Sequence, residues 1–321
     1  MAGEFDLIAR YFNWSASGKG VELGVGDDAA LVSLKPRHQL AVSVDTLVPG
    51  VHFPLDTHPA DIAYKALTVN VSDMAAMGAE PRWFTLALTL SEYDNTWLEA
   101  FSQGLKQAAK QYSVDLIGGD TTRGPQTISI QIMGEVEQGK ALTRAGAQAG
   151  DALFVTSSLG DAAAGLGIHQ ATANLPVSEL LNAQQYCLSR LNRPTARVLE
   201  SRVIKQFATA CIDVSDGLLQ DLSHILNASG LGAVIDTDRM PISSRLSALY
   251  PYEQCLKYAL TGGDDYELLF SIPAAAVDDF QSAMKTAQHA CQQIGYVDSG
   301  LPALIQDHTG QALASDGFQH F

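Results

Sequence analysis

An apolar helical pattern that begins at Pro59 and ends before Gly78 constrains the fold most, because it carries a carboxylate on its apolar side. Counted at helical spacing, Asp73 falls on the same stripe as four small or aliphatic residues, Ile62, Ala66, Val69 and Ala76. A buried carboxylate must be paired, protonated or bound to a metal, because an uncompensated charge in a dry site is heavily penalised. The alternative is a different register that leaves Asp73 exposed near Gly78. This segment alone leaves both interpretations open.

The composition indicates the size of the protein and argues against some classes of partner. The chain has 321 residues, of which 46% are hydrophobic, so it can bury a large core, and this length suggests two domains. Its net charge is −15, and its basic residues do not form runs, which argues against nucleic acid or an anionic membrane as a partner. A protein this acidic that handles phosphates needs divalent cations between its carboxylates and the substrate.

The sequence also indicates where the protein is located and what its cysteines do. There is no run of about 18 apolar residues, and residues 1–6 lack a charged-then-apolar signal, so we expect a cytoplasmic protein. The four cysteines are far apart, without a C-x-x-C pair, and favour neither a zinc site nor a disulfide framework. We expect them to be small core residues. They are Cys187, Cys211, Cys255 and Cys291.

The first half of the chain alternates predicted helices and strands. Apolar periodicity predicts helices at 4–12, 59–78 and 97–112, and strands at 40–44, 83–90, 116–119 and 128–133. The pattern breaks near Gln138, so we place an N-terminal domain at 1–137 and a C-terminal domain at 138–321.

The second half begins again with a strand at 151–156 and a glycine-rich segment at 159–167. These glycines could cradle a phosphate or allow close helix packing, and packing is favoured. Helices are expected between 180 and 207 and after Leu218, with a strand at 210–212 and a turn that enters a strand within 262–270. The predicted fold class is therefore α/β of the α+β type, with two domains that each contain a mixed sheet packed with helices.

Acidic residues recur at the ends of strands in both halves. Asp45, Asp120 and Asp213 each lie at or just past the end of an apolar strand. Ligands in α/β proteins gather at the carboxyl ends of strands, so we expect these acids to converge. With Asp28, Asp73 and Asp216 the site would hold six carboxylates, which cannot all remain ionised without counter-ions. Mg²⁺ resolves this conflict and points to phosphoryl transfer, and the alternative is six unrelated solvated turns.

Six segments in order along nearly the whole chain resemble the thiamine-monophosphate kinase family. The family belongs to the aminoimidazole ribonucleotide synthetase-like superfamily of ATP-binding proteins. Each motif is weak alone, but their common order is specific. The segments are 26–30, 43–46, 69–81, 118–122, 213–217 and 262–268.

The resemblance implies ATP-dependent phosphorylation of thiamine monophosphate to thiamine diphosphate, with several Mg²⁺ ions and ATP as co-substrate. It assigns the metals to Asp28, Ser43, Asp45, Asp73, Asp120, Asp213 and Asp216, and the six aspartates are the expected catalytic residues. It assigns ATP contacts to Gly119, Asp120, Arg144 and Ser215. It assigns the thiamine phosphate to His52, Asp264 and Phe318. Asp264 replaces the glutamate common in the family, which puts the reach of this carboxylate in question.

The same resemblance implies a homodimer formed by strands of the N-terminal domains and a site between the two domains. The apolar strand 84–90 is a candidate for this interface, although an ordinary core strand has the same pattern. The expected chemistry needs no general base, because the second pKa of a phosphate is about 6 and its oxygen is already largely ionised at pH 7. We therefore expect direct in-line transfer without a phosphoenzyme.

Two other interpretations remain. The chain could be a different ATP-using enzyme of the superfamily: aminoimidazole ribonucleotide synthetase, selenophosphate synthetase or a hydrogenase-maturation factor. The last two use an N-terminal and a C-terminal cysteine respectively, whereas here no cysteine precedes Cys187 and the given sequence ends in Gln319, His320 and Phe321. It could also be a non-catalytic nucleotide-binding or thiamine-phosphate-binding module. The presence of all six acids argues against such a module, since a binder needs fewer metals.

Overall fold

The computed structural model describes residues 4–14, 20–92, 94–171, 180–301 and 303–314. The chain divides into two compact units. The first comprises residues up to Lys140 except Ala75–Gly78, and the second comprises Ala75–Gly78 and the chain from Ala141 onward. The change at 140/141 is three residues after the boundary that the sequence suggested. Each unit is described by itself below.

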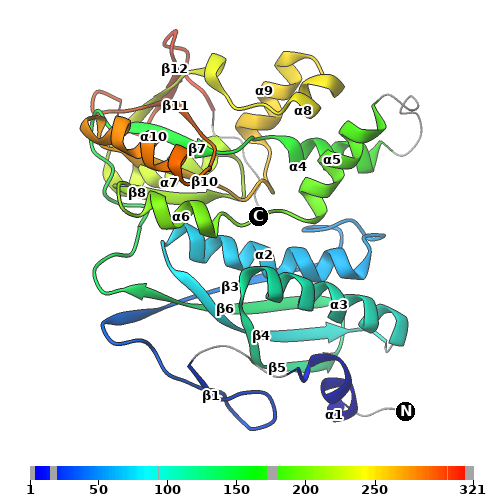
Figure 1. Cartoon of the computed structure of the whole chain (residues 1–321). Helices are drawn as coiled ribbons and strands as arrows, with labels where there is room; N and C mark the ends of the chain where they lie inside the picture. Colours follow the sequence, from blue (N-terminus) through cyan, green and yellow to red (C-terminus); the bar gives the residue numbers. More distant parts are fainter. Residues whose placement is uncertain (1–3, 15–19, 93, 172–179, 302, 315–321) are drawn as a thin grey trace. The chain divides into compact units, whose positions relative to one another are not determined.

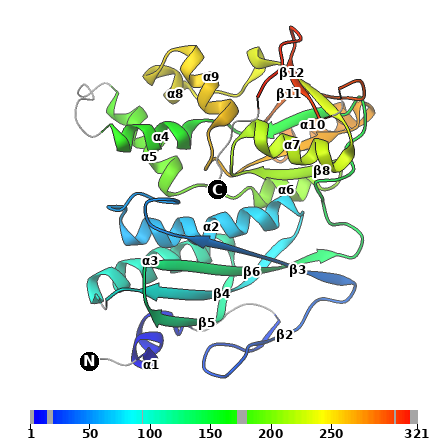
Figure 2. The ribbon, with the colours of Figure 1, turned by 180° about the vertical axis from the view of Figure 1, so that it is seen from behind.

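The first unit is built on a mixed four-stranded sheet in the order β3-β6-β4-β5. β4 and β5 are parallel, and the other neighbours are antiparallel. The helices α2 and α3 lie on one face of this sheet (Figures 1 and 2). The elements are α1 (Glu4–Leu7), the π-helical turn η1 (Ile8–Phe12), β1 (Val21–Leu23), β2 (Leu31–Val32), β3 (His38–Leu47), α2 (Pro59–Ala76), β4 (Glu80–Leu90), α3 (Asn95–Tyr112), β5 (Asp115–Arg123) and β6 (Thr127–Glu137).

Alternation along the strands shows which face α2 and α3 cover. Ile128, Ile130 and Ile132 on β6 are fully buried, as the strand period of two requires for a half-buried strand. On the edge strand β3, the aliphatic residues of the opposite face remain exposed. They are Leu40, Val42 and Val44, with exposed fractions of 43%, 50% and 60%.

The second unit contains a mixed six-stranded sheet in the order β12-β9-β11-β7-β10-β8, in which only the β12–β9 pair is parallel. Its strands are β7 (Ala152–Thr156), β8 (Ala210–Val214), β9 (Gly232–Ile235), β10 (Glu267–Ile272), β11 (Cys291–Asp298) and β12 (Ile305–Asp307). Its helices are α4 (Asp161–Gln170), α5 (Leu181–Asn192), α6 (Val198–Ile204), α7 (Leu218–Ser229), η2 (Thr237–Arg239), α8 (Ser244–Leu249), α9 (Tyr252–Thr261), η3 (Ala274–Ala276) and α10 (Val277–Thr286).

Helices cover both faces of this second sheet, so its inner strands are buried throughout. Leu153 and Val155 of β7 belong to the same core cluster as the apolar side of α7. The residue between them, Phe154, instead contacts Phe280 of α10 edge to face, with 5.2 Å between the ring centroids. The two helices accordingly appear on opposite sides in Figures 1 and 2. Strands buried on both faces tolerate few charges, and those in this unit need internal partners.

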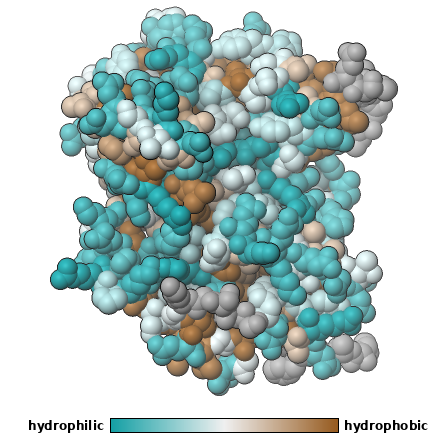
Figure 3. Space-filling model, viewed as in Figure 1, coloured by the Kyte–Doolittle hydropathy of each residue, from teal (hydrophilic) through white to brown (hydrophobic). Residues whose placement is uncertain are grey.

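The predicted fold class is confirmed: each unit is a mixed sheet packed with helices. The one departure in type is the first predicted helix, which is a short α-helical turn followed by a π-helical turn. Within the described residues, no helix is both long and apolar enough to cross a membrane. Hydrophilic residues cover most of the face shown in Figure 3, and apolar residues form separate patches there.

The cysteines agree with their expected role as core residues. Cys187, Cys211 and Cys255 are buried, Cys291 is partly buried, and all four are free thiols. Burial raises the pKa of Cys187 to about 12, so this thiol is protonated at neutral pH.

Candidate active site

Three of the predicted metal ligands come together where β3 passes the second half of α2. The Ser43 hydroxyl lies 2.5 Å from Asp73 Oδ2, to which it donates a hydrogen bond. The Asp45 amide donates to Asn70 Oδ1, one helical turn before Asp73, at 3.1 Å. Asp73 is partly exposed, whereas the four residues that share its stripe are buried. The helix register is therefore as predicted, and Asp73 opens from the apolar stripe toward β3.

Asn70 is a residue of this group that sequence reasoning did not select. Its side chain is fully buried, and its amide nitrogen donates to the Ala66 carbonyl at 2.9 Å. This bond orients the side-chain oxygen toward the Asp45 amide. A buried asparagine in an apolar helix was the available signal, because a buried amide needs partners.

His52 lies in the loop before α2, and its backbone and ring are both engaged. The Val48 amide donates to His52 Nδ1 at 3.1 Å, and Lys65 Nζ donates to the His52 carbonyl at 3.0 Å. Lys65 is 98% buried in α2, so it anchors this loop to the helix. The loop conformation places a partly exposed imidazole in the first unit.

A cavity of about 500 Å³ lies in the first unit beside β5. Apolar side chains from η1 and β5, including Ile8, Phe12 and Leu116, form part of its wall. Asp28, Gly119 and Asp120 also line it, and both carboxylates are exposed. Such a cavity combines an apolar wall with charged groups, a pattern typical of small-molecule sites.

Gly119 is required at its position by the neighbouring strand. Its φ is +153°, and a Cβ built on it would lie 2.0 Å from the Leu86 carbonyl oxygen of β4. Any side chain would push β5 away from β4 at the wall of the cavity. The Gly-Gly-Asp segment therefore brings backbone close to backbone and presents Asp120 at the next position.

The strand order separates two acids that we expected to converge. β3 and β5 are the opposite edges of the sheet, and three strand spacings make about 14 Å between them. Asp45 is in register with Ile130 and Leu86, which face the helices. Asp120 is in register with Ala87, on the other face. Within the first unit, Asp45 and Asp120 therefore lie at opposite edges of the sheet and in register with opposite faces.

In the second unit, Asp213 is the last residue but one of β8, and Ser215 and Asp216 lie in the loop between β8 and α7. Asp213 is buried, whereas Ser215 and Asp216 are partly exposed. The Ser215, Asp216 and Gly217 amides all donate to one oxygen, Oδ2 of the buried Asp221, at 3.1, 3.1 and 3.2 Å. Burial and the charge of Asp216 raise the pKa of Asp221 to about 7, against the effect of these three amides. Sequence reasoning did not select Asp221.

The loop before β10 packs on this same segment. The Asp264 amide donates to the Ser215 carbonyl at 2.8 Å, and the Tyr266 amide donates to the Val214 carbonyl at 2.8 Å. Tyr266 also donates its hydroxyl to Asp264 Oδ1 at 3.1 Å. The structure thus brings the predicted substrate residue Asp264 beside the predicted ATP residue Ser215. Asp264 and Tyr266 have φ of 70° and 52°, a left-handed conformation that non-glycine residues rarely adopt.

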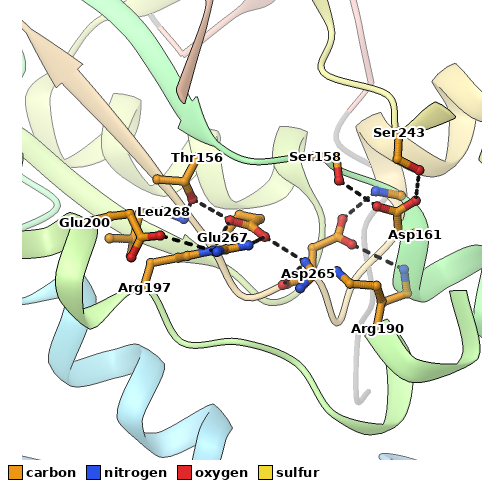
Figure 4. Close-up of polar contacts among 12 residues, drawn as sticks. Thr156, Ser158, Asp161, Arg190, Arg197, Glu200, Ser243, Asp265, Glu267 and Leu268 are labelled. Atoms are coloured by element: carbon orange, nitrogen blue, oxygen red, sulfur yellow. Dashed lines mark hydrogen bonds and ion pairs between the residues drawn. The ribbon is translucent and has the colours of Figure 1, made fainter. Parts of the chain in front are cut away.

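The other two acids of this motif are internal. Glu267 is fully buried, and Arg190, Arg197 and Thr156 all donate to its carboxylate, at 2.5–2.7 Å (Figure 4). Burial alone would lower the pKa of Arg197, but Glu267 raises it above its ordinary value. Arg190 of α5, Arg197 just before α6 and Thr156 of β7 together make this carboxylate acceptable in the core.

Asp265 occupies the amino end of α4, which answers the question left open by the glycine-rich segment. Its carboxylate accepts from the Gly160 amide at 2.6 Å and the Ala162 amide at 3.3 Å. A Cβ on Gly165 would lie 2.4 Å from the Cys187 carbonyl oxygen of α5. These glycines therefore serve packing, and an internal carboxylate takes the place that a phosphate would need.

Two predicted residues are less constrained. Arg144 is exposed, and its neighbour Thr143 accepts a hydrogen bond from the Cys211 amide at the beginning of β8. This places the Arg144 backbone near the end of β8 opposite to Ser215. Phe318, predicted to contact the thiamine ring, lies outside the described residues.

One further group of possible metal ligands lies elsewhere in the second unit. Asp236, Asp238 and His308 have ligand atoms within 4.8 Å of one another among the described residues. Asp236 follows β9 and His308 follows β12, at the edge of the sheet opposite to β8. These side chains are mostly exposed, and none of them belongs to the predicted site.

The donor atoms of the predicted metal ligands suit a hard cation. Ser43, Asp45 and Asp73 offer only carboxylate and hydroxyl oxygens, as do Asp28 and Asp120 at the cavity. Mg²⁺ prefers such oxygen ligands, whereas zinc and copper favour sulfur and imidazole. The residues present therefore fit magnesium.

Comparisons with known proteins agree with this geometry. Residues 26–136 match the family "AIR synthase related protein, N-terminal domain", and residues 148–302 match "AIR synthase related protein, C-terminal domain". The chain is 46% identical over 322 residues to thiamine-monophosphate kinase of Escherichia coli K12, covering 99% of this chain and 98% of that protein. The chain belongs to the thiamine-monophosphate kinase family. It is therefore a kinase.

Solved structures of the thiamine-monophosphate kinase family share the fold. The crystal structure of the kinase from Stenotrophomonas maltophilia K279a has a TM-score of 0.85 at 44% identity, covering 92% of this chain and 93% of that one. A structure described as AaThiL complexed with AMPPCP and TMP has a TM-score of 0.79 at 31% identity, covering 90% and 89%. The family resemblance read from the six motifs is thereby confirmed.

Proposed function

We propose that this chain transfers the γ-phosphoryl group of ATP to thiamine monophosphate, giving thiamine diphosphate and ADP. The observation that carries the proposal is the likeness to a relative of the same fold in complex with AMPPCP and TMP, at 31% identity over 90% of this chain. Near-complete coverage of an E. coli thiamine-monophosphate kinase supports the same substrate pair.

The cavity beside β5 suits the nucleotide. Its apolar wall offers contact area for a purine ring, and Gly119 and Asp120 at its lining are residues that we assign to ATP. In the second unit, we assign Ser215 and Arg144 to ATP. We assign His52, Asp264 and Phe318 to thiamine monophosphate, whose cationic thiazolium ring is attracted by an acidic side chain such as Asp264.

We assign several Mg²⁺ ions to the oxygen ligands, with Ser43, Asp45 and Asp73 as one group and Asp28 with Asp120 as another. Their separation in the sheet of the first unit supports different ions for the two groups. Asp213 and Asp216 are the assigned ligands of the second unit. Mg²⁺ neutralises phosphate charge, which allows two anionic substrates to approach each other at an acidic protein.

The chemical step that we propose is direct in-line transfer. The acceptor phosphate oxygen is largely ionised at pH 7, because the second pKa of a phosphate is about 6, so no side chain needs to remove a proton. The protein's task is then to align the acceptor and the γ-phosphoryl group and to exclude water. Arg144 is assigned to the charge that develops on the transferred group, as arginine matches phosphate geometry.

The decisive experiment is product identification by mass spectrometry after incubation of the purified protein with ATP, Mg²⁺ and thiamine monophosphate. We expect thiamine diphosphate and ADP, and neither product in the presence of EDTA. If ATP and thiamine monophosphate both remain unchanged, the proposed substrates are wrong. Intact-mass measurement with ATP alone tests the in-line step, because a protein heavier by one phosphoryl group would indicate a phosphoenzyme.

We also propose that two copies of the chain pair through the part of the first sheet where β3 is exposed, on the face opposite to α2 and α3. The exposed aliphatic residues there, Leu40, Val42 and Val44, form a continuous row on β3. β4, whose residues 84–90 we expected at the interface, is bonded to a strand on both sides, so it could contribute only its face. In a symmetric dimer, the exposed aliphatic row of one copy would pack against the same row of the second copy.

Light scattering tests this pairing. Val42→Glu is expected to convert a dimer to a monomer, because it buries a charge in an apolar interface. Leu199→Glu is the matched control, since Leu199 is an equally exposed aliphatic residue of the second unit. A wild-type monomer, or a Val42→Glu dimer of unchanged affinity, would contradict the proposal.

A further inference from the structure

The loop that carries Ser215 and Asp216 is wrapped around a carboxylate that no substrate can reach. Asp221, in the first turn of α7, is 98% buried. One of its oxygens, Oδ2, accepts from three successive amides, those of Ser215, Asp216 and Gly217. Three convergent backbone amides form a concave site that elsewhere in proteins holds bound anions. Here a residue of the chain itself fills that site.

The opposite side of the same loop is also fixed. The Ser215 carbonyl accepts from the Asp264 amide, and a Cβ on Gly263 would lie 2.5 Å from that carbonyl oxygen. Gly217 has a φ of 120°, and a Cβ there would lie 2.9 Å from the backbone of Thr261. The amides of the loop therefore turn inward to Asp221, and its carbonyl side rests on the loop that contains Asp264. What remains partly exposed is the pair Ser215 and Asp216.

We infer that Asp221 is the positioning residue of this loop: it sets the direction in which Ser215 and Asp216 face the nucleotide and its metal ion. The inference rests on the proposed function, which assigns these two residues to ATP and Mg²⁺. Asp221 itself contacts neither substrate. Its role follows from the three bonds, because without an acceptor at that point the three loop amides lose their common partner and the loop must turn to find others.

The bonding pattern allows a sharp test, because a single oxygen accepts all three bonds. Asp221→Asn keeps one carbonyl oxygen that can accept from the same amides, whereas Asp221→Ala removes the acceptor. The control is Asp151→Ala, which removes another buried aspartate of the second unit. Asp151 Oδ2 accepts from the Gln148 amide and the Thr209 hydroxyl, at the opposite end of β8 from the loop.

The measurements are thermal unfolding, calorimetric binding of a non-hydrolysable ATP analogue with Mg²⁺, and steady-state kinetics with each substrate varied. We expect folded Asp221→Ala to bind the analogue about 10–100-fold more weakly, with the KM for thiamine monophosphate nearly unchanged. Asp221→Asn should bind within about threefold of wild type, since it retains the acceptor. Asp151→Ala should lose thermal stability without this selective loss of nucleotide affinity.

Four results would overturn the inference. Folded Asp221→Ala could bind the analogue as wild type does, or lose affinity for both substrates equally, which indicates a merely structural role. If the alanine variant does not fold, Asp221→Ser replaces it, because a hydroxyl on a shorter side chain cannot reach all three amides, and unchanged binding would be equally contrary. A wild-type protein that does not bind the analogue would remove the proposed function, and the inference with it.

Discussion

The candidate acids of the two units are held in place by different means. In the first unit, Asp28 and Asp120 are exposed and Asp73 is partly exposed. The surrounding strands and helices are held together by apolar packing and do not depend on these carboxylates. In the second unit, the partly exposed Ser215 and Asp216 lie on a loop whose amides bond to the buried Asp221. The difference predicts that substitutions in the first unit remove activity and spare the fold, whereas substitutions of buried acids in the second unit reduce stability.

The largest effect on stability is expected from a substitution of Glu267, which tests most directly whether buried acids stabilise the second unit. Glu267→Gln removes the carboxylate that pairs with the buried Arg190 and leaves Arg197 with only its ion pair to Glu200. Removing one partner of a buried ion pair costs about 3–5 kcal/mol of unfolding free energy. Urea unfolding followed by fluorescence measures it.

Glu200→Gln is the matched control for that substitution. Glu200 pairs with Arg197 near the edge of the same network, at 3.3 Å. An ion pair with access to solvent contributes about 1 kcal/mol or less. Equal losses in the two variants would show that the second unit does not depend on its buried network.

The converse substitution in the first unit is Asp73→Asn. We expect turnover to fall about 10²–10³-fold, because an assigned metal ligand is lost while Ser43 and the helix stay in place. The unfolding free energy should change by about 0.5 kcal/mol or less, as for other partly exposed positions. The control is Asp279→Asn, an exposed carboxylate on α10. Normal turnover in Asp73→Asn would refute the metal assignment. It would also contradict the expectation that substitutions in the first unit reduce activity rather than stability.

One buried acid in each unit should make the unfolding free energy depend on pH, and the two contributions should have opposite signs. These acids are Asp265 in the second unit and Glu135 in the first. Burial raises the pKa of Asp265 to about 8 from an ordinary value of 3.8, although Arg190 and the Gly160 amide lower it. The folded state then holds a proton that the unfolded state releases, so the unfolding free energy should decrease as pH rises between 3.8 and about 8. Asp265→Asn cannot ionise and should lack this decrease. Parallel profiles of wild type and variant from urea unfolding at several pH values would contradict the assignment.

The smallest effect concerns Glu135 of the first unit. Burial alone would raise the pKa of Glu135, but the Lys35 amide, the Lys35 side chain and Arg82 lower it below its ordinary value of 4.5. Its contribution is therefore present above pH 4.5 and is lost as pH falls through the folded pKa. Because Lys35 is half exposed, we expect Glu135→Gln to cost about 1 kcal/mol or less at pH 7. An increase in that difference on acidification would contradict this sign.

Elements whose residues alternate in polarity were predictable from the sequence. The strand expected at 83–90 is the end of β4 (Glu80–Leu90), and the helix expected at 97–112 is α3 (Asn95–Tyr112) with two further residues. Their pattern records which side faces the core, because apolar burial dominates the energy of such elements. The place of Asp73 on its helix was predictable for the same reason.

Residues whose role depends on distant partners were not predictable. Asp264, Asp265 and Glu267 stand almost side by side in one motif, yet one is partly exposed and two are buried. Their partners Arg190 and Gly160 are more than 70 residues away, so no local pattern distinguishes them. Asp221 is hidden in the same way, because an acid in the first turn of a helix is ordinarily a favourable surface residue.

The sequence by itself determined the two mixed α/β units, the family and the set of acids that the proposed reaction uses. These follow from periodicity and from motifs that are local in the chain. Only the tertiary structure decided which of the candidate residues meet. It brings Ser43 to Asp73 and places Asp45 and Asp120 at opposite edges of one sheet. It also encloses Asp221 within the loop that carries Ser215 and Asp216. The reason is physical, because strand order and long-range hydrogen bonds arise from packing between segments that are far apart in the chain.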